Sequence, residues 1–265
     1  MPDAVICGYA RTPFGRFRGA LSSYSAVELG VRAVEELLRR TGIDPSGGEI
    51  DQVYMGQVLQ AGAGQAPARQ VALGCGMPNS TSCTTINTVC GSSLKAVMIA
   101  ASEIRAGVSE LVVAGGMESM SNAPRFIRES RRGEDVPFKS LLSILSHDGL
   151  TDAFSGELMG NTGETCALEY GISREESDAY SLRSHKLSAK GWENGGIENE
   201  CVSMEELSID EGIRQDADMS TLTSLKPVFS EGGQVTAGNA SQVSDGASAV
   251  LVASEETARR MGLPV

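Results

Sequence analysis

Short apolar runs alternate with amphipathic segments along the first 117 residues of the chain. Runs rich in small or β-branched apolar residues predict buried strands over 4–9, 51–59, 83–89 and 110–116. The intervening segments 25–40 and 65–76, and the stretch from Cys90 to Gly107, have helical spacing. This βαβαβαβ order favours an α/β fold in layers, with a mixed but mostly parallel sheet.

The helix expected after Cys90 has a continuous apolar face. That face is marked by Leu94, Val97, Met98, Ala101 and Ile104, and Gly107 is a suitable end for the helix.

The pattern changes at about residue 118, where apolar periodicity weakens and charge rises. Helical spacing returns over 161–190, with Ser173 and Glu176 in capping-box positions, and 201–242 is irregular and polar. A buried strand over 245–254 and a short helix over 255–262 complete the chain. We therefore expect an α/β core of residues 1–117 and 244–265 with an inserted subdomain over 118–243, mainly helical and irregular.

Charge and composition narrow the classes of partner. The net charge of −12 disfavours binding to nucleic acid or to an anionic membrane surface. No apolar stretch approaches the roughly 18 residues of a membrane span. The six cysteines lack metal-ligand spacing, so no metal site is expected. Without an export signal, we expect a cytoplasmic protein with reduced thiols.

Cys90 lies where a predicted strand passes through a glycine-containing turn into a helix. The first N–H groups of a helix have no intrahelical acceptor and favour negative charge. A cysteine there is expected to favour its thiolate form, and the same N–H groups would stabilise an oxyanion formed by attack on a carbonyl. The alternative is an inert buried cysteine at a helix start, which the local pattern alone slightly favours.

Several motifs, in order along the chain, resemble those of the thiolase family. NTVCGSSLKAV (87–97) resembles the segment around the acyl-accepting cysteine, and GGMESMS (115–121) resembles a glycine-rich loop after a core strand. VTAGNASQVSDGASAVLV (235–252) resembles the signature that binds the pantetheine arm. RTPFGRFRGALS (11–22) and DEGIR (210–214) fit the same family. The resemblance covers most of the chain and corresponds to the amino-terminal half of a thiolase.

The resemblance implies a two-step acyl transfer between coenzyme A thioesters. Cys90 would take the acyl group as a thioester, which then passes to a carbanion from acetyl-CoA or, in reverse, to free coenzyme A. Coenzyme A and acetyl-CoA would be substrates, and no cofactor is expected to remain bound.

The resemblance also assigns coenzyme A contacts residue by residue. Arg214 matches the arginine that packs on the adenine, and Ser241 matches the serine that hydrogen-bonds the pantetheine chain. Apolar positions near the same ligand correspond to Ala237, Phe229, Leu150 and Met159. Without the family, Ser241 would be interpreted as a turn serine and Arg214 as a solvated surface arginine.

Two departures from the family pattern concern single positions. Leu158 replaces a histidine that many members carry just before Met159, which implies a lost ligand contact or a different acyl preference. Ser93 replaces a glycine in the first turn after Cys90, which implies altered packing near the nucleophile.

The third departure concerns the catalytic machinery. The family uses an activating histidine and a second cysteine, both in its carboxy-terminal half. His147 and His185 match neither and are expected to be solvated surface residues, and none of the other cysteines matches. We therefore expect the carboxy-terminal thiolase domain to be absent, by a natural or engineered truncation, and this chain alone to have negligible thiolase turnover.

Two other functions stay open from the sequence. One is a non-catalytic coenzyme A-binding or assembly domain. The other is a condensing enzyme of fatty acid or polyketide synthesis, which the GGMESMS and GNASQVSDG segments disfavour. The family resemblance also implies self-association as a homodimer or homotetramer.

Overall fold

The computed structural model describes residues 2–127, 137 and 141–265, and these form two compact units. The first unit comprises 1–124, 200–211 and 244–265, and the second comprises 125–199 and 212–243. Compactness thus groups residues 118–124 and 200–211 with the sheet, whereas the sequence pattern placed them in the insertion.

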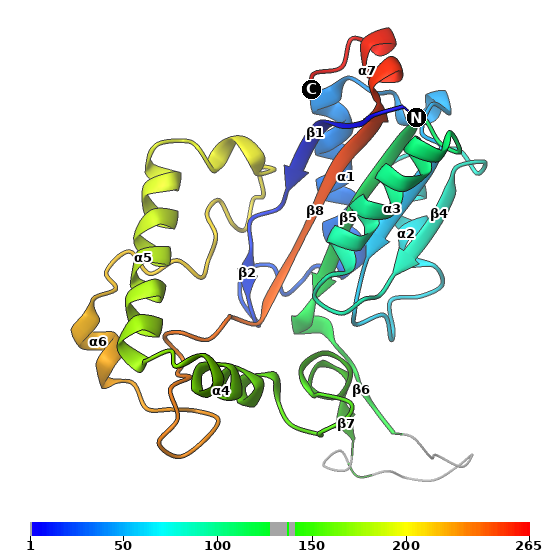
Figure 1. Ribbon diagram of the computed structural model, residues 1–265. Helices are drawn as coiled ribbons and strands as arrows, with labels where there is room; N and C mark the ends of the chain where they lie inside the picture. Colours follow the sequence, from blue (N-terminus) through cyan, green and yellow to red (C-terminus); the bar gives the residue numbers. More distant parts are fainter. Residues whose placement is uncertain (1, 128–136, 138–140) are drawn as a thin grey trace. The chain divides into compact units, whose positions relative to one another are not determined.

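A mixed sheet forms the centre of the first unit (Figure 1). Its strand order is β1 (Ala4–Arg11), β8 (Ser244–Ser254), β5 (Leu111–Ser119), β3 (Gln52–Gly56) and β4 (Ser82–Ile86), and β2 (Gly15–Arg16) also pairs with β8. Strands β3, β4 and β5 pair in parallel, while β8 is antiparallel to both β5 and β1. Strands β1, β3, β4 and β5 therefore share one direction, which confirms a mixed, mostly parallel sheet.

Helices cover both faces of this sheet because strand residues alternate between them. Helices α1 (Ala26–Thr41) and α2 (Pro67–Gly74) pack on one face over Val53, Met55 and Val113. Helix α3 (Ser92–Ala106) packs on the other face over Tyr54 and Val112. Helix α1 begins at a capping box of Ser25 and Glu28 and ends at Gly42, as the sequence predicts.

The buried face of α3 differs from the expected one. Ser92, Ala96, Ala100 and Ile104 are its buried residues, whereas Leu94 is 66% exposed and Met98 is 54% exposed. The helix uses small side chains to lie close to the sheet, so the larger apolar residues that dominate the sequence pattern point away from it. An apolar surface therefore remains on α3 in this unit.

The motif RTPFGRFRG is bound by the two acidic residues of DEGIR. Arg11 donates to both carboxylate oxygens of Asp210, at 2.8 and 2.9 Å. Glu211 accepts from the backbone N–H groups of Arg16, at 2.8 Å, and Ala20, at 3.2 Å. Two segments almost 200 residues apart are thereby joined in the first unit.

The second unit contains the helices α4 (Met159–Tyr170), α5 (Arg174–Glu193) and α6 (Met219–Ser224), and the strand pair β6 (Arg125–Phe126) and β7 (Leu142–Ser143) (Figure 1). The helix expected over 161–190 is two helices, because Gly171 ends α4 in the left-handed conformation. The predicted capping box of Ser173 and Glu176 is confirmed and starts α5.

Other element bounds depart only slightly from prediction. Strand β4 ends at Ile86 rather than 89, because the chain turns before Cys90. Helix α7 (Glu255–Met261) closes the chain as predicted. Helix α6 lies in the stretch that was expected to be irregular. Single helical turns are η1 (Pro45–Gly47), η2 (Met120–Asn122), the π-helical η4 (Leu145–Leu150) and η5 (Glu198–Glu200).

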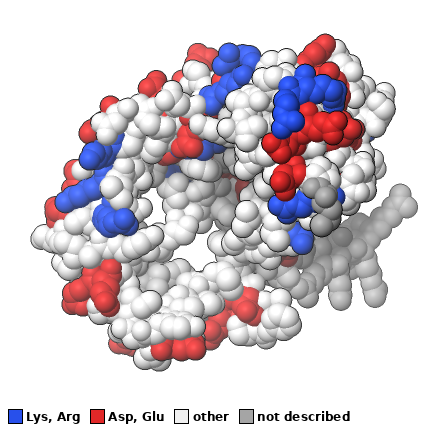
Figure 2. Space-filling model, turned by 45° about the horizontal axis from the view of Figure 1, so that its top comes forward, with Lys and Arg blue, Asp and Glu red and all other residues white. Residues whose placement is uncertain are grey.

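The surface carries the excess of acidic residues without extended blocks of one sign on the face in view. Figure 2 shows Lys and Arg side chains there in small groups, with Asp and Glu side chains between them. Among the described residues, no helix is both long and apolar enough to cross a membrane.

Candidate functional site

Cys90 lies in the turn that joins β4 to α3, two residues before the helix begins, and its side chain is exposed. Ser92 closes this turn. The N–H of Thr88 donates to Ser92 Oγ at 2.9 Å, and that hydroxyl donates to the carbonyl of Val89 at 2.6 Å. Cys90 is thus exposed, and not buried as the alternative interpretation of the sequence supposed.

Val89, the residue before Cys90, has a left-handed backbone with φ of 53°. Such a conformation in a β-branched residue costs on the order of 1–3 kcal/mol and persists only where neighbouring groups hold it. One such group is Asn87, whose Oδ1 accepts from the Val89 N–H at 2.9 Å. The turn that carries Cys90 is therefore a strained structure held by specific hydrogen bonds.

Close backbone approaches fix the first turn of α3 against the sheet. A Cβ on Gly56 would lie 2.6 Å from Ser93 N, and one on Gly116 would lie 2.7 Å from Ser93 Cβ. Gly56 at the end of β3 and Gly116 within β5 thus leave the space that Ser93 occupies. The serine that replaces a family glycine is accommodated because position 116 carries no side chain.

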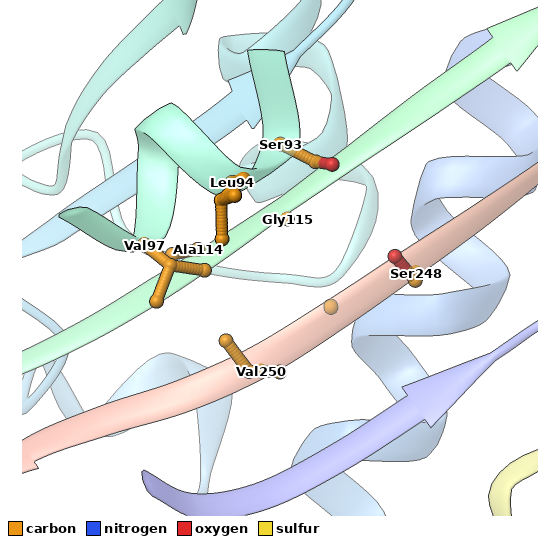
Figure 3. A pocket seen from close by; sticks show the side chains of 8 residues that line it. Ser93, Leu94, Val97, Ala114, Gly115, Ser248 and Val250 are labelled. Carbon is orange, nitrogen blue, oxygen red and sulfur yellow. The ribbon is translucent and has the colours of Figure 1, made fainter. Parts of the chain in front are cut away.

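A shallow pocket of about 170 Å³ lies beside this turn, on the α3 face of the sheet. Figure 3 shows Leu94 and Val97 on the α3 side of it and Val250 on β8, with Ser93 and Ser248 toward one end. The floor is formed by Ala114, Gly115 and Ala249. The pocket is mostly apolar and continues the exposed surface of α3.

The other cysteines differ from Cys90 in their surroundings. Burial raises the pKa of Cys75 to about 12 and is the largest cause that raises the pKa of Cys201 to about 11. Burial also raises the pKa of Cys7 and of Cys83. Cys166, on α4, is exposed like Cys90 but lies within a helix. Cys90 is thus the exposed thiol of the first unit.

The candidate pantetheine-binding loop lies in the second unit and is held from both ends. Glu164 of α4 accepts from the N–H groups of Gln234, at 2.7 Å, and Val235, at 2.9 Å. Asn239 accepts from the N–H of Thr236 at 2.8 Å and donates to Asp178 at 3.0 Å. This loop presents Ala237 and Ser241 as exposed side chains.

Asp178 anchors this loop to α5 although its carboxylate is fully buried. Its second oxygen accepts from Arg174 Nε at 2.8 Å, and Arg174 also donates to the carbonyls of Leu222 and Leu225, at 2.6 and 3.1 Å. Removing either partner of such a buried carboxylate would leave a charge without compensation, so the two bonds to Asp178 hold both partners in place. The network ties the loop to α5 and to α6.

His185 is not the solvated residue that the sequence pattern suggests. Its Nδ1 accepts from the backbone N–H of Arg214 at 3.2 Å, and the side chain is half-buried. Burial lowers the pKa of His185, and the nearby charge of Arg214 acts in the same direction. The exposed Arg214, the candidate adenine contact, is thus tied to α5. His147 is bonded to the neighbouring Asp148 and packs edge-on against the ring of Phe126.

Three apolar candidates lie around the start of α4 in the second unit, where Thr151, next to Leu150, bridges to Leu158. Phe229 packs against α4 so closely that a Cβ on Gly160 would lie 2.3 Å from its ring. Met159, the first residue of α4, is 40% exposed, and the adjacent Leu158 is 43% exposed. Leu150 ends the π-helical turn and is half-buried.

The structure thus places the predicted residues in two sets, each within one unit. Cys90 belongs to the first unit, and the six candidate coenzyme A contacts belong to the second. Sequence reasoning missed the residues that position them, namely Asn87, Glu164, Asp178, His185 and Asn239. Among the described residues, no group of His, Cys, Asp and Glu is arranged to hold a metal ion.

Cys90 is thus an exposed cysteine at a hydrogen-bonded strand-to-helix turn of a layered α/β fold. Residues 4–256 match the family model described as "Thiolase, N-terminal domain". The chain belongs to the thiolase family and corresponds to its amino-terminal domain.

Relatives and solved structures agree with this family. The chain is 47% identical over 273 residues to the "Probable acetyl-CoA acetyltransferase" of Escherichia coli (strain K12), covering 100% of this chain and 69% of the relative. The Ascaris suum Acat5 thiolase, solved in complex with coenzyme A, aligns with a TM-score of 0.90 at 36% identity, covering 98% of this chain and 68% of the other. The Bacillus anthracis acetyl-CoA acetyltransferase aligns with a TM-score of 0.92 at 37% identity, covering 99% and 68%. The chain therefore spans about two thirds of these proteins.

Proposed function

We propose that this domain performs the first half of a thiolase reaction, in which Cys90 accepts an acyl group from acyl-coenzyme A. The Cys90 thiolate attacks the thioester carbonyl carbon, and the resulting tetrahedral intermediate carries an oxyanion. The bond from that carbon to the coenzyme A sulfur then breaks. Coenzyme A leaves as its thiol with the proton that Cys90 gave up, and the acyl group remains as a thioester on Cys90.

The observation that carries this proposal is the exposed Cys90 at the start of α3. Its turn is stabilised by Asn87 and Ser92, and the N–H of Ser92, the first of α3, donates to the carbonyl of Val89 at 3.1 Å. The N–H groups that follow in the first turn of a helix have no intrahelical acceptor, and these are the ones proposed to face the ligand. Such N–H groups favour both a thiolate and the oxyanion that develops during attack.

The coenzyme A moiety is proposed to contact the second unit. Ser241 and Ala237 are exposed on a loop that Glu164, Asn239 and Asp178 hold in place, which suits an extended pantetheine arm. Arg214 is exposed and its backbone is fixed by His185, which suits packing on the adenine. Phe229, Leu150 and Met159 would line the same ligand, which enters and leaves as a substrate. The complex of the Ascaris suum thiolase with coenzyme A supports this assignment by family membership.

The second half of the reaction is proposed to need groups beyond the first unit. That unit contains no histidine, because His147 and His185 both belong to the second. Its remaining cysteines are buried or half-buried. We therefore expect acylation of Cys90 without appreciable turnover in this chain of 265 residues.

Domain division, assembly and location are part of the same proposal. The core would comprise 1–117 and 244–265, with 118–243 as the segment that contacts coenzyme A. We expect a homodimer or homotetramer in the cytoplasm. Equilibrium sedimentation tests the assembly, and a single monomeric species at high protein concentration would contradict it.

The acylation step is tested by the release of coenzyme A. Wild-type protein and Cys90→Ala are mixed with an excess of acetyl-CoA, and free coenzyme A is quantified over time by chromatography. The proposal predicts a release from the wild type that approaches one equivalent per chain and that the variant lacks. Equal release from the two proteins would contradict it.

A further inference from the structure

The turn that carries Cys90 is linked to a loop on the neighbouring strand through one side chain. Asn87 bonds in two directions: its Oδ1 accepts from the N–H of Val89 at 2.9 Å, and its Nδ2 donates to the carbonyl of Val58 at 3.4 Å. The first bond holds the residue that precedes the nucleophile. The second reaches the segment that follows β3.

That segment is itself fixed by an acidic residue of β5. Glu118 accepts from the N–H groups of Val58 at 2.8 Å and of Leu59 at 3.2 Å, one on each carboxylate oxygen. Gln57 adds a bond from its Nε2 to the carbonyl of Leu59, at 3.2 Å. The segment over 57–59 is therefore held from β5 and presents the Val58 carbonyl toward Asn87.

Placing the carboxylate of Glu118 at this position costs free energy, because part of it is removed from water. Burial raises the pKa of Glu118, and the nearby Asp245 acts in the same direction, while the two backbone N–H groups act against it. Glu118 is half-buried, and a carboxylate partly removed from water is stabilised by the hydrogen bonds it accepts. Its bonds in this structure go to the backbone of Val58 and Leu59.

The linkage affects Cys90 through the backbone conformation of Val89. A valine with a φ of 53° relaxes toward an extended conformation unless its N–H and carbonyl are held. Ser92 holds the carbonyl, and Asn87 holds the N–H. Relaxation at Val89 would rotate the peptide that leads into Cys90 and move its sulfur relative to the first N–H groups of α3.

We infer that Asn87 and Glu118 are positioning residues for the nucleophile, through a relay from Glu118 to the 57–59 segment, to Asn87, to Val89 and so to Cys90. The inference rests on the proposed role of Cys90. Neither residue touches the reacting atoms in this relay. Asn87 acts through the backbone of Val89, and Glu118 acts one step earlier through the backbone of Val58.

The test measures the reactivity of Cys90 directly, without acyl transfer. Iodoacetamide alkylation is followed by peptide mass mapping, and the rate at Cys90 is divided by the rate at Cys166, the exposed cysteine of α4, in the same molecule. The wild-type ratio is expected to exceed one clearly. A ratio near one would overturn the proposed nucleophilic role itself, and the inference with it.

Asn87→Ala removes both bonds, and we expect it to lower the ratio by about fivefold, the equivalent of one hydrogen bond. Asn87→Ser restores a short acceptor for the N–H of Val89 but not the donor to the carbonyl of Val58, so we expect it to recover only part of the ratio. Complete recovery would overturn the contribution of Glu118. Glu118→Gln places an amide N–H₂ against a backbone donor, and we expect an intermediate loss. Glu49→Gln, on an exposed residue, is the matched control and should leave the ratio unchanged.

All rates are taken well below the melting temperature of each variant, measured by circular dichroism. A lower ratio with partial rescue by serine supports the relay, because a general loss of structure would change both cysteines and would not be rescued. An unchanged ratio in folded Asn87→Ala overturns the inference, as does an equal loss in the alanine and serine variants. If Asn87→Ala does not fold, the alkylation ratios of Glu118→Gln and Glu49→Gln are compared instead. A lower ratio in Glu118→Gln alone supports the relay, and equal ratios in the two variants overturn it.

Discussion

Asn239 donates a 3.0 Å hydrogen bond from Nδ2 to Oδ1 of Asp178, a carboxylate that is fully buried on α5. The other oxygen of Asp178 is bonded to Arg174. The loop with the candidate pantetheine contacts is thus fixed by the buried Asp178 on one side and by Glu164 of α4 on the other.

Removal of Asp178 should destabilise the second unit. Asp178→Ala leaves Arg174 without its carboxylate and removes one of the two acceptors of Asn239, and we expect a loss of about 3 kcal/mol in the free energy of unfolding. Trp192, the single tryptophan of the chain, lies on α5 and reports the transition by fluorescence in urea. Asp216→Ala, on an exposed residue, is the control. Equal midpoints for the two variants would contradict the assigned role.

The stability of the second unit should fall as the pH is lowered through the range of histidine. Burial lowers the pKa of His185 below its usual 6.5. Between that value and the lowered pKa, the unfolded chain binds a proton that the folded chain does not, so stability decreases as pH falls through this window. His185→Gln should show a weaker decrease in Trp192 unfolding midpoints between pH 7 and pH 5. Parallel curves for wild type and variant would exclude this assignment.

The side chain of Ser241 should strengthen coenzyme A binding. Loss of one hydrogen bond to the ligand predicts an affinity about fivefold lower for Ser241→Ala, measured by titration calorimetry. Ser220→Ala, also exposed in the second unit, is the matched control and should bind like the wild type. Arg214→Ala should weaken coenzyme A binding more than binding of pantetheine, because its proposed contact is the adenine. Unchanged affinity in both variants would refute the assigned contacts.

Multiple turnovers should be undetectable with this chain. Acetoacetyl-CoA and coenzyme A are incubated with catalytic amounts of the protein, and the absorbance of acetoacetyl-CoA is followed. A missing general acid–base group typically lowers a rate about 10²–10⁴-fold, so we expect no loss above the level of Cys90→Ala. A clear rate would show that the residues of this chain suffice for both halves of the reaction.

The sequence predicts the layers of the first unit because strand and helix periodicities there are regular. The apolar face that the sequence shows on α3 is only partly the buried one, because packing against the sheet selects small residues at positions 96 and 100 over the larger Leu94 and Met98. The position of Cys90 follows from motif and pattern together. The family resemblance, rather than periodicity, indicates the coenzyme A contacts, and those contacts stay predictions.

The supporting residues could not be predicted in the same way. Asp178 lies in a polar helix whose composition gives no sign of a buried carboxylate, and its partner Asn239 is 61 residues away. Asn87 acts through a turn whose left-handed valine has no signature in the sequence, since glycine or asparagine is expected at such a position. Long-range partners and backbone strain thus become visible only in three dimensions.

The most direct test of the account is the site of acetylation. The wild-type protein is incubated with acetyl-CoA, digested at low pH to preserve thioesters, and the acetylated fraction of each cysteine is determined by mass spectrometry, with Cys90→Ala as the control. The account predicts one acetyl group, on Cys90, at a fraction well above that of the equally exposed Cys166, and no comparable adduct in the variant. Acetylation that is absent from Cys90, or equal at Cys90 and Cys166, would contradict it.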